Sequence, residues 1–134
     1  MISPSDKKDL VMVRIEQAEK CISDTEYAMA DGRLAMASNR LYYGMFYAMV
    51  ALGLLRDYKS SKHQQMIGWF NKNFVHTGIF PKHFTRLVKD AFDARVESDY
   101  EVSEPITTAT LEARLADMKT FISTIKAWLE ANPA

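Results

Sequence analysis

The chain has 134 residues, of which 17 are basic and 17 acidic, so its formal net charge is zero. That length suits one domain, residues 1–134, and an apolar fraction of 48% is enough for a hydrophobic core. A single cysteine, Cys21, excludes a disulfide within the chain and predicts a buried thiol in a reducing compartment. The zero net charge argues against a protein that simply coats nucleic acid or an anionic membrane.

Neither a membrane span nor a targeting segment is expected. The longest uncharged stretch, from Leu41 to Leu55, has fifteen residues, whereas a spanning helix needs about 20. The first residues carry acidic and basic side chains and no apolar signal core. We therefore predict a soluble, cytoplasmic protein.

Helices account for the whole pattern of the chain, because glycine and proline are scarce and no pattern indicates strands. Capping residues, proline positions and apolar spacing mark five segments. We expect the first from Ser3 to Gly32, the second over about 33–56, the third after Ser61, the fourth with Pro81 in its first turn, and the fifth capped by Thr107 or Thr108. The predicted fold is an all-α, antiparallel four- to five-helix bundle.

The second predicted helix is apolar nearly all round, as a central or interface helix is. On one side it carries only small residues, which allow another helix to approach closely: Ala37, Gly44, Ala48 and Ala51. We take this side as one basis for predicting a homodimer.

Two arginines interrupt apolar stripes, where a plain bundle has apolar residues. Arg40 lies on a stripe of the second helix formed by Met36, Tyr43, Tyr47, Val50 and Leu54, and Arg95 lies on the stripe of the fourth helix. A buried arginine needs partners that offset its desolvation. One polar site between the two helices is therefore predicted, and its candidate ligand-binding residues are Arg40, Tyr43, Tyr47, Arg95, Asp99 and Tyr100. These groups form either a ligand-binding or catalytic site, or a buried network that only holds the bundle in register.

The three histidines, His63, His76 and His83, do not have the spacing of a zinc site, and the five glycines are too dispersed for a phosphate-binding loop. We therefore expect no metal and no cofactor. His63 starts the third helix, where it is either an exposed first-turn residue or close enough to approach the polar site.

Charge is unevenly distributed along the chain. Between Arg56 and Lys89 there are seven basic residues and one acid, Asp57. The predicted basic surface comprises Lys59, Lys62, Lys72, Lys82, Arg86 and Lys89. This segment either presents an anion-binding surface or is a solvated face neutralised by the acidic fifth helix.

Four blocks of the sequence carry a resemblance to a known family. They are Ser38-Asn39-Arg40-Leu41-Tyr42-Tyr43-Gly44-Met45-Phe46-Tyr47-Ala48; Ser61-Lys62-His63; Phe70-Asn71-Lys72-Asn73-Phe74-Val75 with Thr77-Gly78; and Pro81 followed by Arg95-x-x-x-Asp99-Tyr100. In this order, from about residue 10 to 130, they resemble the small prokaryotic HEPN-domain proteins. The resemblance implies an α-helical bundle that usually dimerises and is often encoded beside a minimal nucleotidyltransferase in a toxin–antitoxin pair.

In the ribonuclease members of that family, an arginine is followed after four to six residues by a histidine that acts on RNA with it. Here Arg40 matches the arginine, but Tyr47 stands where the histidine would be. A phenol is a poor proton acceptor at neutral pH, so the ribonuclease motif is degenerate.

Three functions remain open. The first is a non-enzymatic or weakly active HEPN protein that binds nucleotide, RNA or a nucleotidyltransferase partner. The second is a metal-independent ribonuclease with Arg40, Tyr47 and His63 as candidate catalytic residues. The third is a purely structural interaction module.

Overall fold

The computed structural model describes residues 2–100 and 106–133, with side chains except at 98–100. Over these residues the chain forms five α-helices and one π-helical turn and has no strand. The elements are α1 (Pro4–Ala30), α2 (Leu34–Leu55), α3 (His63–Phe70), the π-helical turn η1 (Asn71–Val75), α4 (Phe84–Tyr100) and α5 (Thr108–Ala131). The all-α helical bundle predicted from the sequence is confirmed.

Most helix ends lie where the capping residues predicted them. The Ser3 hydroxyl accepts a hydrogen bond from the Asp6 amide (3.1 Å), and Thr107 caps α5 in the same way through the Thr110 amide (3.2 Å). Gly32 follows α1 with a φ of +71°, a conformation that suits glycine. The start of α4 was predicted too early: Pro81 belongs to a turn closed by the Phe84 amide on the Pro81 carbonyl (3.0 Å), and the helix begins at Phe84.

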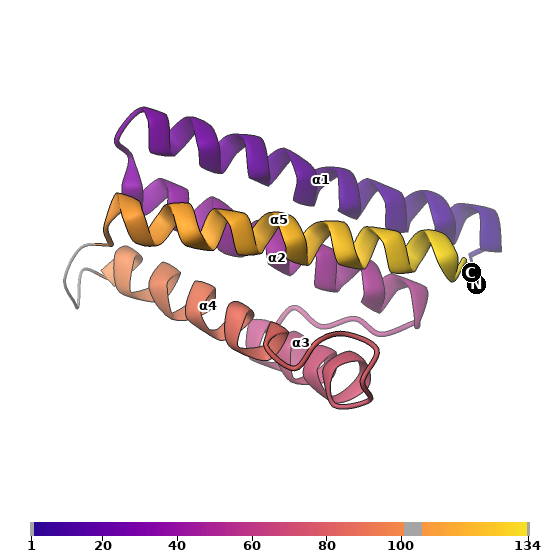
Figure 1. Ribbon diagram of the computed structural model, residues 1–134. Helices are drawn as coiled ribbons and strands as arrows, with labels where there is room; N and C mark the ends of the chain where they lie inside the picture. Colours follow the sequence, from indigo (N-terminus) through magenta and orange to yellow (C-terminus); the bar gives the residue numbers. More distant parts are fainter. Residues whose placement is uncertain (1, 101–105, 134) are drawn as a thin grey trace.

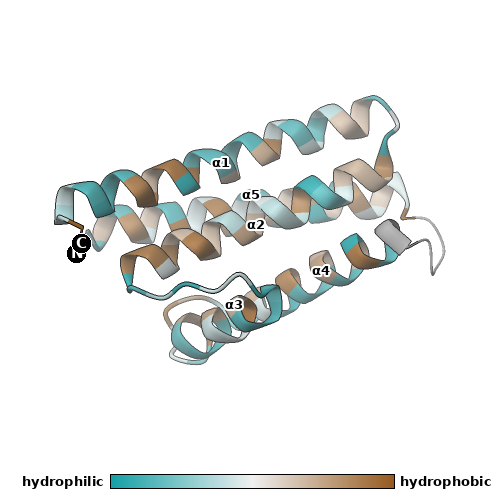
Figure 2. Ribbon diagram, turned by 180° about the vertical axis from the view of Figure 1, so that it is seen from behind, coloured by the Kyte–Doolittle hydropathy of each residue, from teal (hydrophilic) through white to brown (hydrophobic). Residues whose placement is uncertain are grey.

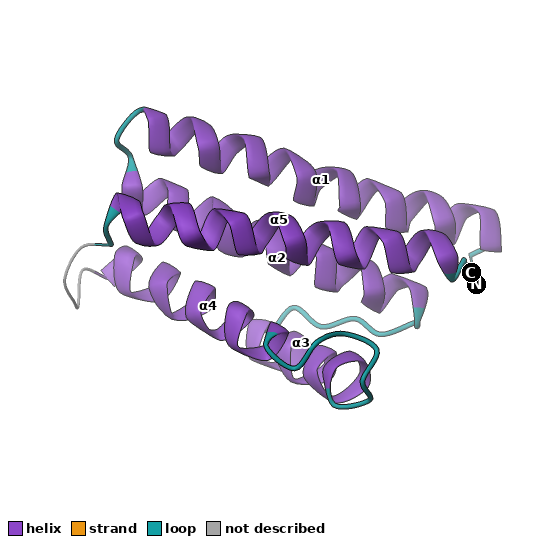
Figure 3. Cartoon of the chain, in the orientation of Figure 1, coloured by secondary structure: helices purple, strands orange, loops and turns teal. Residues whose placement is uncertain are grey.

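Helix α2 is at the centre of the bundle and contacts α1, α3, α4 and α5. Figure 1 shows α1, α2 and α5 running alongside one another, with α4 below them and α3 at one end of α4. The start of α1 and the end of α5 lie together at one end of the bundle. The loop between α2 and α3 runs back along the molecule, as the teal segment of Figure 3 shows. It therefore brings the start of α3 beside the middle of α2.

The core is formed by the inward faces of all five helices, which carry apolar residues in Figure 2. Its aromatic centre joins α3, η1, α4 and α5: Phe121 lies 5.5 Å from Phe70 and 5.0 Å from Phe84 between ring centroids. Cys21 is buried in α1, as predicted. None of the helices within the described residues is both long and apolar enough to cross a membrane.

The small residues of α2 are used within the chain. Ala37, Gly44, Ala48 and Ala51 are all buried. A Cβ atom at Gly44 would collide with the Met118 side chain of α5 and lie 3.0 Å from Cys21 of α1. These residues therefore let α1 and α5 approach α2, and they do not supply the surface on which we based a homodimer.

We expect Gly44→Ala to lower the free energy of unfolding by about 1–3 kcal/mol, because the added methyl group overpacks the contact between three helices. Urea unfolding followed by circular dichroism measures the change. Gly68→Ala in α3 is the matched control, since nothing lies within 4 Å of its Cβ position. Alanine there should be neutral or stabilising by up to about 1 kcal/mol. Equal effects of the two substitutions would contradict the close packing at Gly44.

Candidate functional site

The stripe of α2 that contains Arg40 lies at the surface of the bundle, contrary to the prediction that it is buried. Tyr43 and Tyr47 are half-buried, and Met36 is 50% exposed. The buried face of α2 is the neighbouring one, formed by Leu41, Tyr42, Met45, Met49 and Leu52. Because both faces are apolar, periodicity alone does not distinguish them, and the contacts with α1, α4 and α5 decide which is covered.

Arg40 is consequently a half-buried residue whose charged end lies among polar and aromatic groups. The Asn39 side-chain carbonyl accepts hydrogen bonds from Arg40 Nε (3.1 Å) and Nη2 (2.8 Å). The guanidinium carbon lies 5.2 Å from the centroid of the Tyr43 ring, within cation–π distance. Asn39 occupies one edge of the guanidinium, so other N–H donors of Arg40 can contact a ligand.

Arg95 reaches the same tyrosine from α4. Its Nη2 donates a hydrogen bond to the Tyr43 hydroxyl (3.3 Å), and its guanidinium carbon lies 5.5 Å from the Tyr43 centroid and 5.8 Å from that of Tyr42. The structure thus brings together Arg40, Tyr43 and Arg95. Tyr47 lies next to them, with its ring centroid 6.1 Å from that of Tyr43. The side chains of Asp99 and Tyr100, two further residues of the predicted site, lie outside the described residues.

His63, the first residue of α3, enters this group of side chains. Its Nδ1 lies 2.7 Å from the Tyr42 hydroxyl, and its ring stacks on Phe46 with a centroid distance of 4.3 Å and an interplanar angle of 13°. The ring also meets Tyr43 edge-on at 5.6 Å. Of the two placements considered for His63, the structure shows the one beside the polar site. We name Arg40, Tyr42, Tyr43, Phe46, Tyr47, His63 and Arg95 the arginine–tyrosine cluster.

Burial governs the protonation of both partners in the His63–Tyr42 contact. It lowers the pKa of His63, with a further contribution from the positive charge of Arg95. It also raises the pKa of Tyr42 well above its usual range, an effect that Arg95 opposes and Tyr43 reinforces. At neutral pH the tyrosine therefore keeps its proton and the histidine is uncharged. With Tyr42 as donor, Nδ1 of His63 accepts the hydrogen bond and the ring proton is on Nε2.

The lowered pKa of His63 predicts a loss of stability in mild acid. The unfolded chain binds a proton near pH 6.5, the ordinary value, whereas the folded protein resists it. As the pH falls below about 6.5, protonation of His63 therefore stabilises the unfolded state and the free energy of unfolding decreases. The decrease stops once the pH is below the lowered pKa of His63 in the folded protein, where both states bind the proton. Between pH 7.5 and 5.5, the melting temperature should fall more in the wild type than in His63→Gln. His76→Gln, at an exposed position, is the control and should behave as the wild type; an identical fall in all three proteins would contradict the assignment.

The six residues of the predicted basic surface are all exposed. Two of them have acidic partners on α4 itself: Lys89 contacts Asp93 (2.6 Å) and Arg86 contacts Asp90 (3.7 Å). The other four, Lys59, Lys62, Lys72 and Lys82, make no ion pair within the described part of the chain. Helix α5 has three acidic and three basic residues, so it is not acidic as predicted, and neither of these two ion pairs involves it. Lys62 directly precedes His63 and is the member that adjoins the arginine–tyrosine cluster.

Sequence reasoning missed Tyr42 and Phe46, although both lie in the quoted block around Arg40. Neither is on the stripe that contains Arg40, because Tyr42 is one residue from Tyr43 and points to the buried face. They become part of the cluster only because His63 packs against them. No group of three His, Cys, Asp or Glu side chains suited to a metal comes together in 2–100 and 106–133.

The helices and this cluster define an all-α bundle domain with a polar and aromatic surface centred on its second helix. A sequence model of the HEPN domain matches residues 11–128, and the chain belongs to this family. A relative in Thermotoga maritima, named "UPF0332 protein", is 31% identical over 72% of this chain and 73% of its own length. Two relatives in Methanocaldococcus jannaschii carry the names "Putative toxin MJ0142" and "Putative toxin MJ0605". The first is 28% identical over 86% of this chain and 78% of its own, and the second is 26% identical over 90% of both.

Proposed function

We propose that this HEPN-domain protein is a toxin-like component that binds RNA or nucleotides at the arginine–tyrosine cluster. One observation carries the proposal: the guanidinium groups of Arg40 and Arg95, from two helices, lie 5.2 and 5.5 Å from the same Tyr43 ring. Both distances are measured from one ring, so two positive charges lie around the same half-buried tyrosine, where they attract anions. A phosphate fits, because the N–H groups of arginine match its oxygens in geometry and charge.

The rings around the two arginines favour a nucleic acid over a simple anion. Tyr43, Phe46 and Tyr47 are all half-buried, so part of each ring is accessible. Bases of single-stranded RNA commonly stack on such side chains while arginine or lysine contacts the backbone. Lys62, exposed beside His63, would extend the positive charge along the same strand. The toxin names of two relatives support the toxin-like role.

A homodimer and a minimal nucleotidyltransferase partner belong to this proposal, and both rest on the family resemblance. Light scattering of the purified protein would give twice the 15.3 kDa mass of the chain if it dimerises. A nucleotidyltransferase encoded beside it should co-purify with the tagged chain. A monomeric mass, or a partner that does not co-purify, removes the corresponding part of the proposal.

Fluorescence anisotropy with a labelled single-stranded RNA tests the binding. We expect Arg40→Ala to weaken it about tenfold, because a hydrogen bond to a charged group contributes about 1.5–3 kcal/mol. Arg86→Ala is the matched control: this arginine is exposed on α4 and contacts Asp90, so its loss should change the affinity little. Binding of neither RNA nor nucleotide by the wild type, or equal losses in both variants, would refute the proposal.

Arg40→Met separates binding from a purely structural role. Arg40 is half-exposed and contacts only Asn39 and Tyr43 among the contacts seen, so methionine should change the melting temperature by no more than a few degrees. A loss of RNA affinity without a loss of stability supports the binding site. The reverse result supports the internal cross-link.

A second candidate, metal-independent RNA cleavage, is favoured by the 2.7 Å contact between His63 and Tyr42. This role requires the other tautomer of His63, in which Nδ1–H donates to the Tyr42 hydroxyl oxygen and the unprotonated Nε2 can accept the proton of a ribose 2′-hydroxyl. Tyr47 at the motif position cannot accept that proton readily. The 2′-oxygen would attack phosphorus and the departing 5′-oxygen would take up a proton, leaving a 2′,3′-cyclic phosphate and a 5′-hydroxyl. The test is incubation of the protein with RNA in the presence of a chelator. Cleavage that His63→Ala abolishes and His76→Ala does not would establish this activity, and intact RNA would rule it out.

A further inference from the structure

Arg40 also borders an open hollow between the end of α1 and the start of α2. The hollow has a volume of about 400 Å³ and is lined by Asp24, Tyr27, Asp31, Arg33, Met36 and Arg40, among others. Binding sites for small molecules typically measure about 300–1,000 Å³. This hollow therefore has room for one nucleotide, and it shares Arg40 with the arginine–tyrosine cluster.

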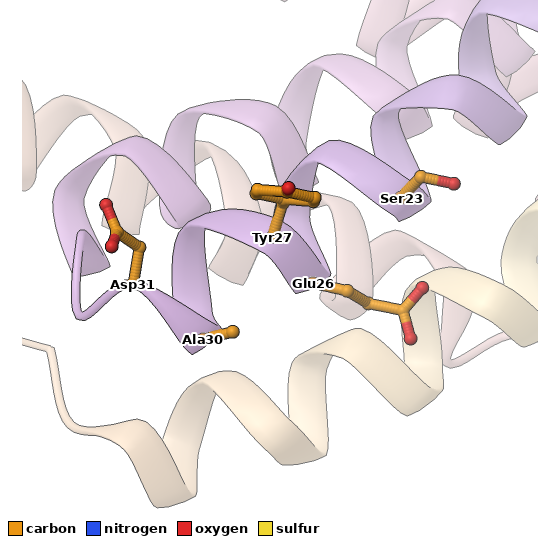
Figure 4. A pocket seen from close by; sticks show the side chains of 5 residues that line it. All are labelled: Ser23, Glu26, Tyr27, Ala30 and Asp31. Atoms are coloured by element: carbon orange, nitrogen blue, oxygen red, sulfur yellow. The ribbon is translucent and has the colours of Figure 1, made fainter.

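Tyr27 forms an exposed aromatic platform at this place. Its side chain is 82% exposed, the largest exposure among the large apolar residues that are exposed on the described surface. A second hollow, of about 410 Å³, lies against the same tyrosine and is lined by Ser23, Glu26, Ala30 and Asp31 as well. In Figure 4 the ring stands on the outer surface of α1, with Asp31 to one side and Glu26 and Ser23 to the other. Since the ring is exposed and lines both hollows, it can stack against a flat ligand.

Of the four charged side chains that line the hollow, two form an ion pair with each other and two do not. Asp31 forms an ion pair with Arg33, so their charges offset each other. Asp24 and Arg40 have no such partner within the described part of the chain, and both act on the pKa of the buried Cys21 thiol. Burial raises that pKa most, Arg40 lowers it and Asp24 raises it. The hollow is therefore bordered by the carboxylate of Asp24, a negatively charged acceptor, and by the guanidinium of Arg40, a positively charged donor.

This arrangement matches one nucleobase better than the others. The Watson–Crick edge of guanine has two adjacent N–H donors, N1–H and the N2 amino group, which a single carboxylate accepts together. Adenine and cytosine each place an acceptor nitrogen beside their amino group, so a carboxylate would face a lone pair. Uracil has one N–H between two carbonyl oxygens.

Resting on the proposed function, we propose that this hollow is a guanine-selective base pocket for the RNA or nucleotide held at Arg40. The base stacks on Tyr27 against Met36, its N–H donors bind Asp24, and its phosphate binds Arg40. The occupied pocket makes binding at the arginine–tyrosine cluster selective for guanine.

Isothermal titration of the full chain with GMP and AMP tests this pocket. We expect GMP to bind at least tenfold more tightly than AMP. Asp24→Asn should remove the preference by weakening GMP binding relative to AMP binding about tenfold. Tyr27→Ala should weaken GMP binding by tenfold or more, since base stacking on an aromatic side chain contributes about 1–3 kcal/mol. Glu26→Gln is the matched control, because Glu26 neighbours Tyr27 but contacts Lys119 (3.3 Å); it should behave as the wild type.

Equal affinities of the wild type for GMP and AMP, or a preference that survives Asp24→Asn, would overturn the pocket. Melting curves of each variant confirm that it is folded. Arg40→Ala distinguishes the pocket from the proposed function. If it weakens both nucleotides equally while neither is preferred, the function stands and the pocket fails. If it changes neither affinity while Asp24→Asn still removes a guanine preference, the contacts of the base with Asp24 and Tyr27 stand, whereas the phosphate contact with Arg40 and the proposed function fail.

Discussion

Replacing Arg95 with alanine should weaken RNA binding by about tenfold. In the double variant, with Arg40 replaced as well, the loss of affinity should be larger than in either single variant but smaller than the product of the two single losses. Arg95 contributes a charged donor from α4, and it holds the Tyr43 hydroxyl at 3.3 Å. Because Arg40 contacts the same ring, each substitution also changes the surroundings of the other arginine. Residues that share a partner typically show coupling energies of about 0.5–3 kcal/mol in a double-mutant cycle.

Salt dependence gives this cycle a second measurement. Each positive charge that contacts a phosphate of single-stranded RNA adds about 0.7 to the slope of log affinity against log salt concentration. The double variant should therefore have a smaller slope than the wild type by about 1.4. Arg14→Ala on α1, where the guanidinium contacts Gln17 (2.9 Å), is the control. An unchanged slope in the double variant would show that neither arginine contacts the RNA backbone.

The largest loss of stability is expected for Phe121→Ala, at about 3–5 kcal/mol of unfolding free energy. Phe121 is fully buried on α5, and its ring meets those of Phe70 on α3 and Phe84 on α4. Its removal leaves a cavity where three elements meet, and the neighbouring rings are themselves fixed by further packing and cannot easily fill it. Chemical denaturation measures the change.

Leu10→Ala is the control for this substitution, because Leu10 is 44% exposed on α1. Its loss should change the unfolding free energy by about 0.5 kcal/mol or less. RNA affinity measured below the unfolding transition should stay unchanged in both variants, since neither residue belongs to the arginine–tyrosine cluster. A loss below about 1 kcal/mol for Phe121→Ala would mean that α5 does not join α3 and α4 as described.

The helices and most of their ends could be predicted because their signals are local. Ser3 and Thr107 accept hydrogen bonds from backbone amides three residues ahead, and Gly32 adopts a positive φ that suits glycine. The family could likewise be predicted from the blocks around Arg40 and His63, which stand in order along the chain. The start of α4 was placed at Pro81 because proline favours the first helical turn, yet there it forms a separate turn that leads into the helix.

The composition of the site followed only in part from the sequence. Arg40 and Arg95 could be singled out because a charged residue on an apolar stripe is conspicuous at helical spacing. The partners of His63 could not, since Tyr42 and Phe46 are seventeen residues or more away along the chain. Their contact depends on the course of the loop between α2 and α3, for which no local pattern exists.

By itself, the sequence determined that this protein is an all-α bundle with two arginines in unusual places and an uneven distribution of charge within a net charge of zero. Only the tertiary structure decided which apolar face of α2 is covered. It places the small residues around Gly44 against α1 and α5 and leaves the stripe of Arg40, Tyr43 and Tyr47 at the surface. The physical reason is that burial depends on which helices pack against a face, and a helix that is apolar nearly all round offers several faces of similar hydrophobicity.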